Sequence, residues 1–264
     1  MVLTQGTLTA ATYNVHKCVG MDVRHDPERI ASVVREIGAD IIGLQEVDNR
    51  SGGKRLSAQM EFIAKYTGYT ALPGPTIRRV DGHYGNVLLT RWPLIESREI
   101  NLNVPGREPR GAIEGLVRVR SAEVRIIVVH LGLAAAERWV QICRLAEVIR
   151  HRNSGRLILL GDMNEWYPRS RGLDLLHRYM GKSNTIPSYP AWCPFLSLDR
   201  IWVRPRDSLI KVRAHATALS RVASDHLPVV AEISLDGAGS KEQETHADES
   251  VPPDLIRRRK EQSA

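Results

Sequence analysis

Acidic, amide and imidazole side chains recur along this sequence where apolar runs come to an end. They occur in six segments: Asn14 and His16; Gln45, Glu46 and Asp48; His130; Asp162, Asn164 and Glu165; Asp199; and Asp225 and His226. Strands that end at the same edge of a sheet deliver such side chains into one polar cleft. These segments carry carboxylates, amides and imidazoles but no nucleophilic serine motif, which favours a hard metal ion and an activated water over covalent catalysis.

Each of these residues taken alone has a structural alternative, because a carboxylate or histidine that follows a strand often caps a turn. Six segments of the same composition are harder to explain as caps. The amides of Asn14 and Asn164 are expected to donate hydrogen bonds to an anionic substrate without adding negative charge beside it. The general base is left open between His226 and Asp162.

The elements that position these residues are predicted to alternate between strands and helices. The strands are expected at 8–15, 40–47, 85–89, 113–119, 124–130, 157–161, 200–203 and 229–233. The helices are expected at 27–37, 57–67, 134–150 and 170–179. Such a pattern predicts an α/β or α+β domain. Residues 186–196 are expected to form a further strand that lines the core, and Trp166, Trp192 and Trp202 are expected to pack in the core rather than stack at the cleft rim.

Composition is that of a globular domain. The 264 residues are 42% hydrophobic and 25% charged, which argues against wholesale disorder, collagen-like repeats and a coiled coil. No apolar run reaches the length of a membrane-spanning helix, and the first residues do not resemble a secretory signal. Residues 1–236 are predicted to form one domain, and the polar residues 237–264, with an RRRK run at 257–260, a disordered tail.

Charge and cysteine content narrow the environment but not the substrate. The formal net charge is +7 and arginine supplies most of the 37 basic residues, which suits nucleic acid, anionic lipid or phosphorylated metabolites. Three cysteines without paired spacing predict neither a disulfide scaffold nor a zinc site. We therefore expect a cytoplasmic monomer with no integral membrane segment.

Seven blocks of this sequence, in order, resemble the endonuclease/exonuclease/phosphatase superfamily, which includes deoxyribonuclease I, exonuclease III, neutral sphingomyelinases and inositol-polyphosphate 5-phosphatases. The blocks are TYNVH, LQEVD, GNVLLTRWPL, VVHLG, GDMNEW, LDRIWV and SDHLPVVAEI. The GNVLLTRWPL block and the PGREPRGA segment at 105–112 look more like an uncharacterised bacterial branch than like exonuclease III. The resemblance implies a four-layered α/β/β/α sandwich, with two mixed sheets packed face to face, helices outside, and metal-dependent cleavage of phosphate esters.

The resemblance also implies roles for individual residues. Glu46 looks like the principal Mg²⁺ ligand, with Mn²⁺ as a substitute, Asn14 helps to hold the metal site, and Asp225 is a further acidic residue near the metal. Asp162 and Asn164 match the pair that positions the attacking water and a phosphate oxygen. His226 matches the catalytic histidine and Asp199 its carboxylate partner, while His130 matches a second catalytic histidine of two branches.

Three further residues are candidates for binding substrate. Asn86 could line the cleft, with a turn before a strand as the alternative. Arg107 and Arg110 could clamp a phosphate, with a solvated loop as the alternative. The function expected from all of this is hydrolysis of a phosphodiester or phosphomonoester by an activated water. Nucleic acid and a phospholipid head group are the alternative substrates, and a non-enzymatic binding protein is the rival outside the enzymes.

Overall fold

The computed structural model describes residues 6–50, 58–152, 155–183 and 185–236. The predicted tail, residues 237–264, and residue 57 of the second predicted helix lie outside the described residues. Among those described, no helix is both long and apolar enough to cross a bilayer.

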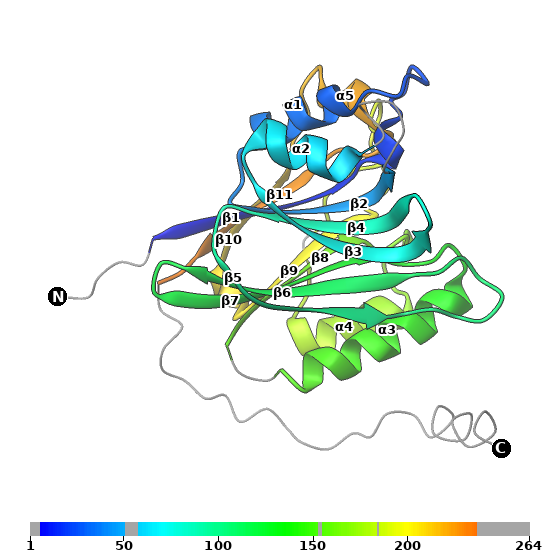
Figure 1. Ribbon diagram of the computed structural model, residues 1–264. Coiled ribbons are helices and arrows are strands. Elements are labelled where there is room, and N and C mark those ends of the chain that lie inside the picture. Colours follow the sequence, from blue (N-terminus) through cyan, green and yellow to red (C-terminus); the bar gives the residue numbers. More distant parts are fainter. Residues whose placement is uncertain (1–5, 51–57, 153–154, 184, 237–264) are drawn as a thin grey trace.

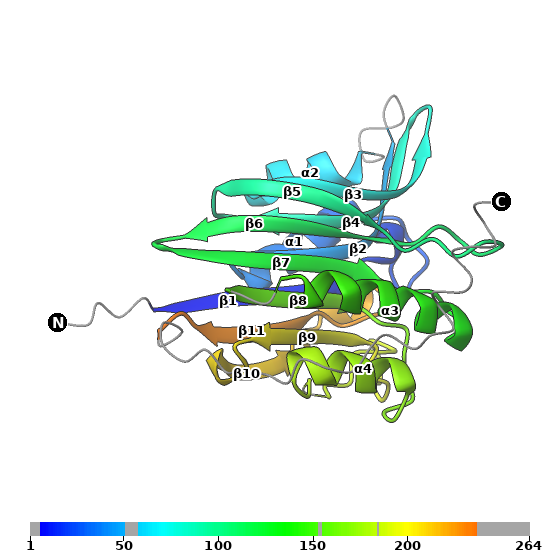
Figure 2. The same ribbon diagram turned by 90° about the horizontal axis from the view of Figure 1, so that it is seen from below.

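Two mixed sheets form the centre of the molecule (Figures 1 and 2). The first has the strand order β10-β11-β1-β2-β4-β3 and the second the order β5-β6-β7-β8-β9. The strands of the first sheet are β1 (Thr7–Asn14), β2 (Ile41–Arg50), β3 (Thr70–Arg79), β4 (Gly82–Thr90), β10 (Leu209–Ala214) and β11 (Val229–Ser234). Those of the second are β5 (Leu94–Asn101), β6 (Gly111–Val119), β7 (Ala122–His130), β8 (Arg156–Asp162) and β9 (Asp199–Arg204).

Helices cover the outer face of each sheet, so the predicted four-layered sandwich is confirmed. On the first sheet lie α1 (Pro27–Ile37), α2 (Gln59–Thr67) and α5 (Ser220–Ala223), and on the second lie α3 (Ala135–Arg150) and α4 (Arg171–Met180). Two short 3₁₀ helices, η1 (His16–Cys18) and η2 (Arg206–Ser208), complete the described elements. Asp26 caps α1 by accepting a hydrogen bond from the Arg29 backbone, Pro27 begins the helix and Gly38 ends it in the left-handed conformation, as such signals predict.

The central strands are buried on both faces, which explains their continuous apolar runs. In β8, Ile158 and Leu160 point into the core between the sheets, whereas Leu157 and Leu159 point toward α3 and α4. The sheets approach closely at Gly43 of β2, where an added Cβ would lie 2.2 Å from Cδ1 of Leu160.

One end of the sandwich collects the residues of interest. There β1, β7 and β8 finish and β9 and β11 begin, on the right in Figure 1. We call this the site end.

Candidate active site

Strand register aligns three of the candidate residues in the second sheet. His130 of β7 pairs with Asp162 of β8, and Asp162 pairs in turn with Asp199 of β9. Residues in register on neighbouring strands project to the same face of a sheet. One imidazole and two carboxylates therefore stand side by side at the site end, and all three are buried.

The first sheet contributes Asn14 and Glu46. The amide Nδ2 of Asn14 donates to Oε1 of Glu46 at 3.2 Å and to Oδ2 of Asp162 at 3.0 Å. Asn14 thereby joins a carboxylate of one sheet to a carboxylate of the other. Both amide hydrogens are used within the protein, so the expected donation from Asn14 to substrate is not what this geometry shows.

The predicted strand 40–47 would place Glu46 at a strand end, but Glu46 does not lie at one. Strand β2 continues to Arg50, and its register with β4 shifts between Leu44 and Val47. The Glu46 backbone within this bulge has φ of 59°, a conformation rare for a residue with a side chain. The bulge aims the carboxylate toward Asn14, and the half-buried Glu46 side chain is placed by this local distortion.

His226 and Asp199 form a buried pair, with Nδ1 of the ring 2.8 Å from Oδ2 of the carboxylate. Nε2 of the same ring lies 3.8 Å from Oδ2 of Asp162. Burial by itself lowers the pKa of His226, but the negative charges of Asp199, Asp162 and Asp225 outweigh it and raise the pKa to about 10. Without a bound metal, these neighbouring carboxylates favour the protonated form of the ring.

His130 has the opposite character. Burial lowers its pKa to about 3, and Asp162 opposes this only in part. Its Nε2 lies 3.0 Å from Nδ2 of Asn164, which also donates to the carbonyl of Leu131 at 2.9 Å. Because an amide nitrogen only donates, the neutral His130 accepts at Nε2 and carries its hydrogen on Nδ1. The amide of Asn164, like that of Asn14, therefore donates its hydrogen bonds to groups within the protein.

Asp225 lies at the more open side of this group. Its side chain is 28% exposed, and Oδ1 lies 3.9 Å from Nδ1 of His16. The neighbouring Ser224 donates from Oγ to the backbone carbonyl of Asn14 at 2.8 Å. This contact ties the segment that carries Asp225 and His226 to the end of β1.

The three predicted substrate-binding residues differ in their placement. Asn86 of β4 is buried; its Nδ2 donates to the Gly111 carbonyl at 2.9 Å and its Oδ1 has no hydrogen-bond partner among the described residues. Arg110 is buried, pairs with Glu108 at 3.1 Å, and its charge helps to lower the pKa of His130. Arg107 is exposed in the β5–β6 connection and contacts none of the described candidate residues.

Three residues that sequence reasoning missed support the site. Buried Ser188 donates from Oγ to Oδ2 of Asp199 at 2.6 Å, and the Tyr189 ring lies 4.9 Å from the His226 ring. Tyr84 of β4 places its hydroxyl against Glu46, and burial, with the negative charge of Glu46, raises its pKa. Tyr84 directly precedes the GNVLLTRWPL block, so its position beside a recognised motif could have identified it in the sequence. No motif in the sequence identifies Ser188 or Tyr189.

The expected core strand at 186–196 is wrong. These residues form an irregular turn closed by a single bridge between Tyr189 and Leu196. Trp192 is 65% exposed and Trp166 55%, so only Trp202, at 1%, packs in the core as predicted. Prolines at 187, 190 and 194 remove backbone donors that a ladder would need, which explains the turn.

The donor set at the site end could hold a metal ion. Oxygens of Asp162 and Asp199 and a ring nitrogen of His226 lie within 4.8 Å of one another, and a metal would bind the His226 nitrogen only after that nitrogen had lost its proton. Oδ1 of Asp199 is buried and has no hydrogen-bond partner among the described residues, so it could accept a cation or a proton donor. Carboxylate oxygens, with Glu46 adjoining through Asn14, are the ligands that Mg²⁺ prefers.

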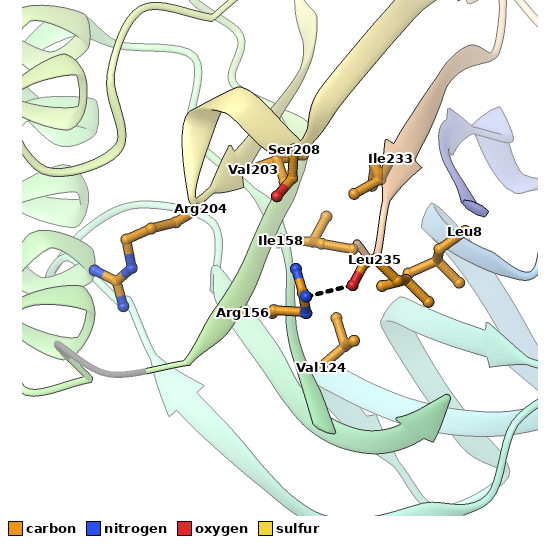
Figure 3. A pocket seen from close by; sticks show the side chains of 9 residues that line it. All are labelled: Leu8, Val124, Arg156, Ile158, Val203, Arg204, Ser208, Ile233 and Leu235. Carbon is orange, nitrogen blue, oxygen red and sulfur yellow. Dashed lines mark hydrogen bonds between the residues drawn. The ribbon is translucent and has the colours of Figure 1, made fainter. Parts of the chain in front are cut away.

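A small pocket at the opposite end of the sandwich lacks such chemistry (Figure 3). Leu8, Val124, Ile158, Ile233 and Leu235 supply much of its lining, together with Arg156, which donates to the Leu235 carbonyl at 2.5 Å. No carboxylate or imidazole is among the described residues that line it.

Comparison with known proteins agrees with this geometry. Residues 11–226 match the model of the Endonuclease/Exonuclease/phosphatase family. The uncharacterized protein YbhP of Escherichia coli K12 is 29% identical over 254 residues, covering 88% of this chain and 98% of its own length.

Two solved structures from Bacteroides thetaiotaomicron share the fold. An endonuclease/exonuclease/phosphatase family protein superposes with a TM-score of 0.72 at 18% identity, covering 87% of this chain and 98% of the other. The mannosyl-6-phosphatase Bt3783 superposes with a TM-score of 0.69 at 17% identity, covering 85% and 98%.

Proposed function

Because this chain belongs to the endonuclease/exonuclease/phosphatase family, we propose that it is a Mg²⁺-dependent hydrolase that cleaves phosphodiesters by attack of an activated water. The observation that carries the proposal is the Asn14 amide, which joins Glu46 of one sheet to Asp162 of the other. Four carboxylates and two histidines converge around it from both sheets. The hydroxyl of Ser188 donates to Asp199 and that of Ser224 to the Asn14 carbonyl, neither of them to an imidazole, which disfavours a serine nucleophile.

Glu46 and Asp162 would hold the metal, with Asp225 beside them. Bound Mg²⁺ supplies positive charge that stabilises the phosphate oxygens as the bond breaks. Asn14 keeps the two carboxylates apart and oriented, since its amide donates to both. The half-exposed surroundings of Glu46 and Asp225 leave an approach for substrate, whereas Asp162 and Asp199 are shielded from solvent.

His226 is assigned the role of a cation beside the phosphate rather than that of the base, because a carboxylate lies beside each of its ring nitrogens. Asp199 lies beside Nδ1 of this ring and Asp162 lies 3.8 Å from Nε2, so a hydrogen on Nε2 would be within reach of a phosphate bound next to Asp162. Asp162 is left to accept the proton of the attacking water. The oxygen of that water forms the new bond to phosphorus, and the ester oxygen leaves.

His130 adds a neutral donor. Its Nδ1 hydrogen has no acceptor among the described residues, so it is available to a phosphate oxygen. The low pKa of this buried ring keeps it from competing with the metal for the charge of Asp162. Asn164 acts by fixing this tautomer and the backbone after β8.

Hydrolysis of bis-p-nitrophenyl phosphate tests the proposal. We expect turnover with Mg²⁺ or Mn²⁺ that EDTA abolishes, and a loss of at least about 10³-fold in Glu46→Gln, because the metal loses its main charged ligand. Glu123→Gln, at an exposed position in β7, is the matched control and should retain turnover. Full activity in EDTA, or near-normal turnover by Glu46→Gln at saturating Mg²⁺, would overturn the proposal.

A phosphomonoester is the second candidate substrate. It is favoured by the shared fold with the mannosyl-6-phosphatase Bt3783. p-Nitrophenyl phosphate measured beside the diester distinguishes the two, since a monoesterase turns over the former faster.

A further inference from the structure

Large exposed hydrophobic side chains gather at the site end. Eleven are exposed among the described residues, and nine of them lie at this end of the sandwich, eight on connections and Val222 in the short helix α5. The other two, Ile95 of β5 and Ile210 of β10, lie on edge strands near the opposite end. Monomeric proteins rarely concentrate apolar side chains in this way without an interaction to cover them. We call the nine residues the apolar rim.

Four members of the apolar rim are aromatic, and they are held on ordered backbone. These are Trp166, Tyr167, Trp192 and Phe195. The Tyr167 amide donates to Glu165 at 3.1 Å, and the Arg138 guanidinium lies 5.2 Å from the centre of the Trp166 ring.

The turn that carries Trp192 and Phe195 is fixed to the site itself. The Phe195 amide donates to the Tyr189 carbonyl at 3.0 Å, and the Ala191 amide donates to the Asp225 carbonyl at 2.7 Å. Arg221 further donates to the Trp192 carbonyl at 3.1 Å. The rings are therefore presented to solvent from rigid positions directly beside candidate site residues.

Five members of the apolar rim are aliphatic: Met21, Val23, Val80, Leu133 and Val222. Unpaired nucleobases bind proteins largely by stacking on aromatic rings, and an aliphatic tip offers no such surface. An aliphatic tip gains free energy when it enters hydrocarbon, and Trp and Tyr favour the boundary between lipid and water. The mixture of side chains thus favours a lipid surface over a nucleic acid.

Unpaired arginines accompany the apolar rim. Arg107, Arg169 and Arg171 are exposed on connections at the site end or at the start of α4, and none makes an ion pair with a described residue. Basic side chains near a membrane are attracted to anionic head groups, and this attraction adds to the burial of apolar side chains. These three arginines therefore supply cationic side chains at the same end of the molecule as the apolar rim.

We propose that the apolar rim docks this protein on an anionic phospholipid bilayer, with the candidate active site facing the head-group phosphates. The docking stands on the exposed residues alone. The conclusion that a head-group phosphoester is the substrate rests in addition on the proposed function.

Flotation of the full chain with vesicles tests the docking in the presence of EDTA, so that turnover plays no part. Binding to vesicles of phosphatidylcholine with phosphatidylglycerol is compared with binding to vesicles of phosphatidylcholine alone. Binding to single-stranded DNA is measured separately. The double variant Trp192→Ser/Phe195→Ser should bind anionic vesicles about tenfold or more weakly than the unchanged protein. The matched control Ile95→Ser/Ile210→Ser removes two exposed hydrophobic residues from the other end and should bind normally. Every variant keeps the RRRK run at 257–260, so its attraction is common to all.

Three results would overturn the docking: no binding to anionic vesicles, equal binding by both double variants, or rim-dependent binding to DNA without binding to vesicles. Both variants should melt at the temperature of the unchanged protein, because all four side chains are exposed. Turnover of the soluble diester keeps the two proposals separate. Rim-dependent vesicle binding without turnover would contradict the proposed function alone, and normal turnover without such binding would contradict the docking alone.

Discussion

The Nδ1 atom of His226 lies 2.8 Å from Oδ2 of Asp199, and both side chains are buried. The same carboxylate oxygen accepts a hydrogen bond from Ser188, so the orientation of the Asp199 carboxylate does not depend on the imidazole alone. Asp199 begins β9 while His226 follows α5, and the pair therefore depends on the placement of two separate segments.

We expect His226 and Asp199 to act as a unit. His226→Ala should lower kcat by about 10²- to 10³-fold, because removing one positioned donor to the charge that develops on the phosphate typically costs about that much. Asp199→Asn should cost less alone and add little to His226→Ala, since residues that act together have non-additive effects. Steady-state kinetics of the two single variants and the double variant measure this, and additive losses would show separate roles.

Asn14→Ala should weaken activation by Mg²⁺. Without the amide, Glu46 and Asp162 face each other with no donor between them, and residues that orient metal ligands typically contribute about 10- to 100-fold to affinity. The measurement is the Mg²⁺ concentration for half-maximal turnover. Thr12→Ala, which removes a buried hydroxyl two residues earlier on β1, is the control; an equal shift in that variant would point to a general effect on the strand.

The sequence predicted the central strands because both of their faces are buried. The three strands it missed, β3, β5 and β10, are all edge strands. Strand β3 contains Pro73 and Pro75, and β5 reads LIESREIN with most of its side chains exposed. An edge strand has only one neighbour and can lack a continuous apolar run, so hydrophobic patterning does not find these three. The fourth edge strand, β9, is almost wholly buried and was predicted.

The site shows a similar division. The type and order of the candidate residues were readable, since polar residues interrupt otherwise apolar runs. The direction in which the Glu46 side chain points could not be predicted, because it depends on a bulge that only the pairing of β2 with β4 defines. Ser188 and Tyr189 come from an irregular turn, whose position is set by contacts with distant segments rather than by any periodic pattern.

Stability of the metal-free protein should depend on the charge of His226. Burial opposes that charge, but Asp199, Asp162 and Asp225 raise the folded pKa to about 10, above the value of about 6.5 in an unfolded chain. The stabilisation from protonated His226 is thus complete below about pH 6.5 and is lost as the pH rises toward 10. Urea unfolding in EDTA between pH 6 and 10 should show this decline, and His226→Gln should show a flatter profile. Parallel profiles would contradict the assignment.

The buried ion pair between Arg138 and Glu165 should be important for stability. Nε and Nη2 of Arg138 both lie 3.2 Å from Oε2 of Glu165, and the two side chains are only 4% and 6% exposed. Arg138→Met keeps most of the volume but leaves the Glu165 carboxylate buried without its cation. Breaking such a pair costs about 3–5 kcal/mol of unfolding free energy, because the remaining charge has lost both water and partner. Arg118→Met breaks the exposed pair with Glu123 and should cost less than about 1 kcal/mol. Urea unfolding of both variants gives the comparison, and equal losses would show that burial does not set the strength of the inner pair.

Glu165 also accepts from the Tyr167 amide, so Arg138→Met should in addition loosen the segment that presents Trp166 and Tyr167. Faster amide hydrogen exchange at residues 165–168 would report that change, and unchanged exchange there would restrict the role of the pair to global stability.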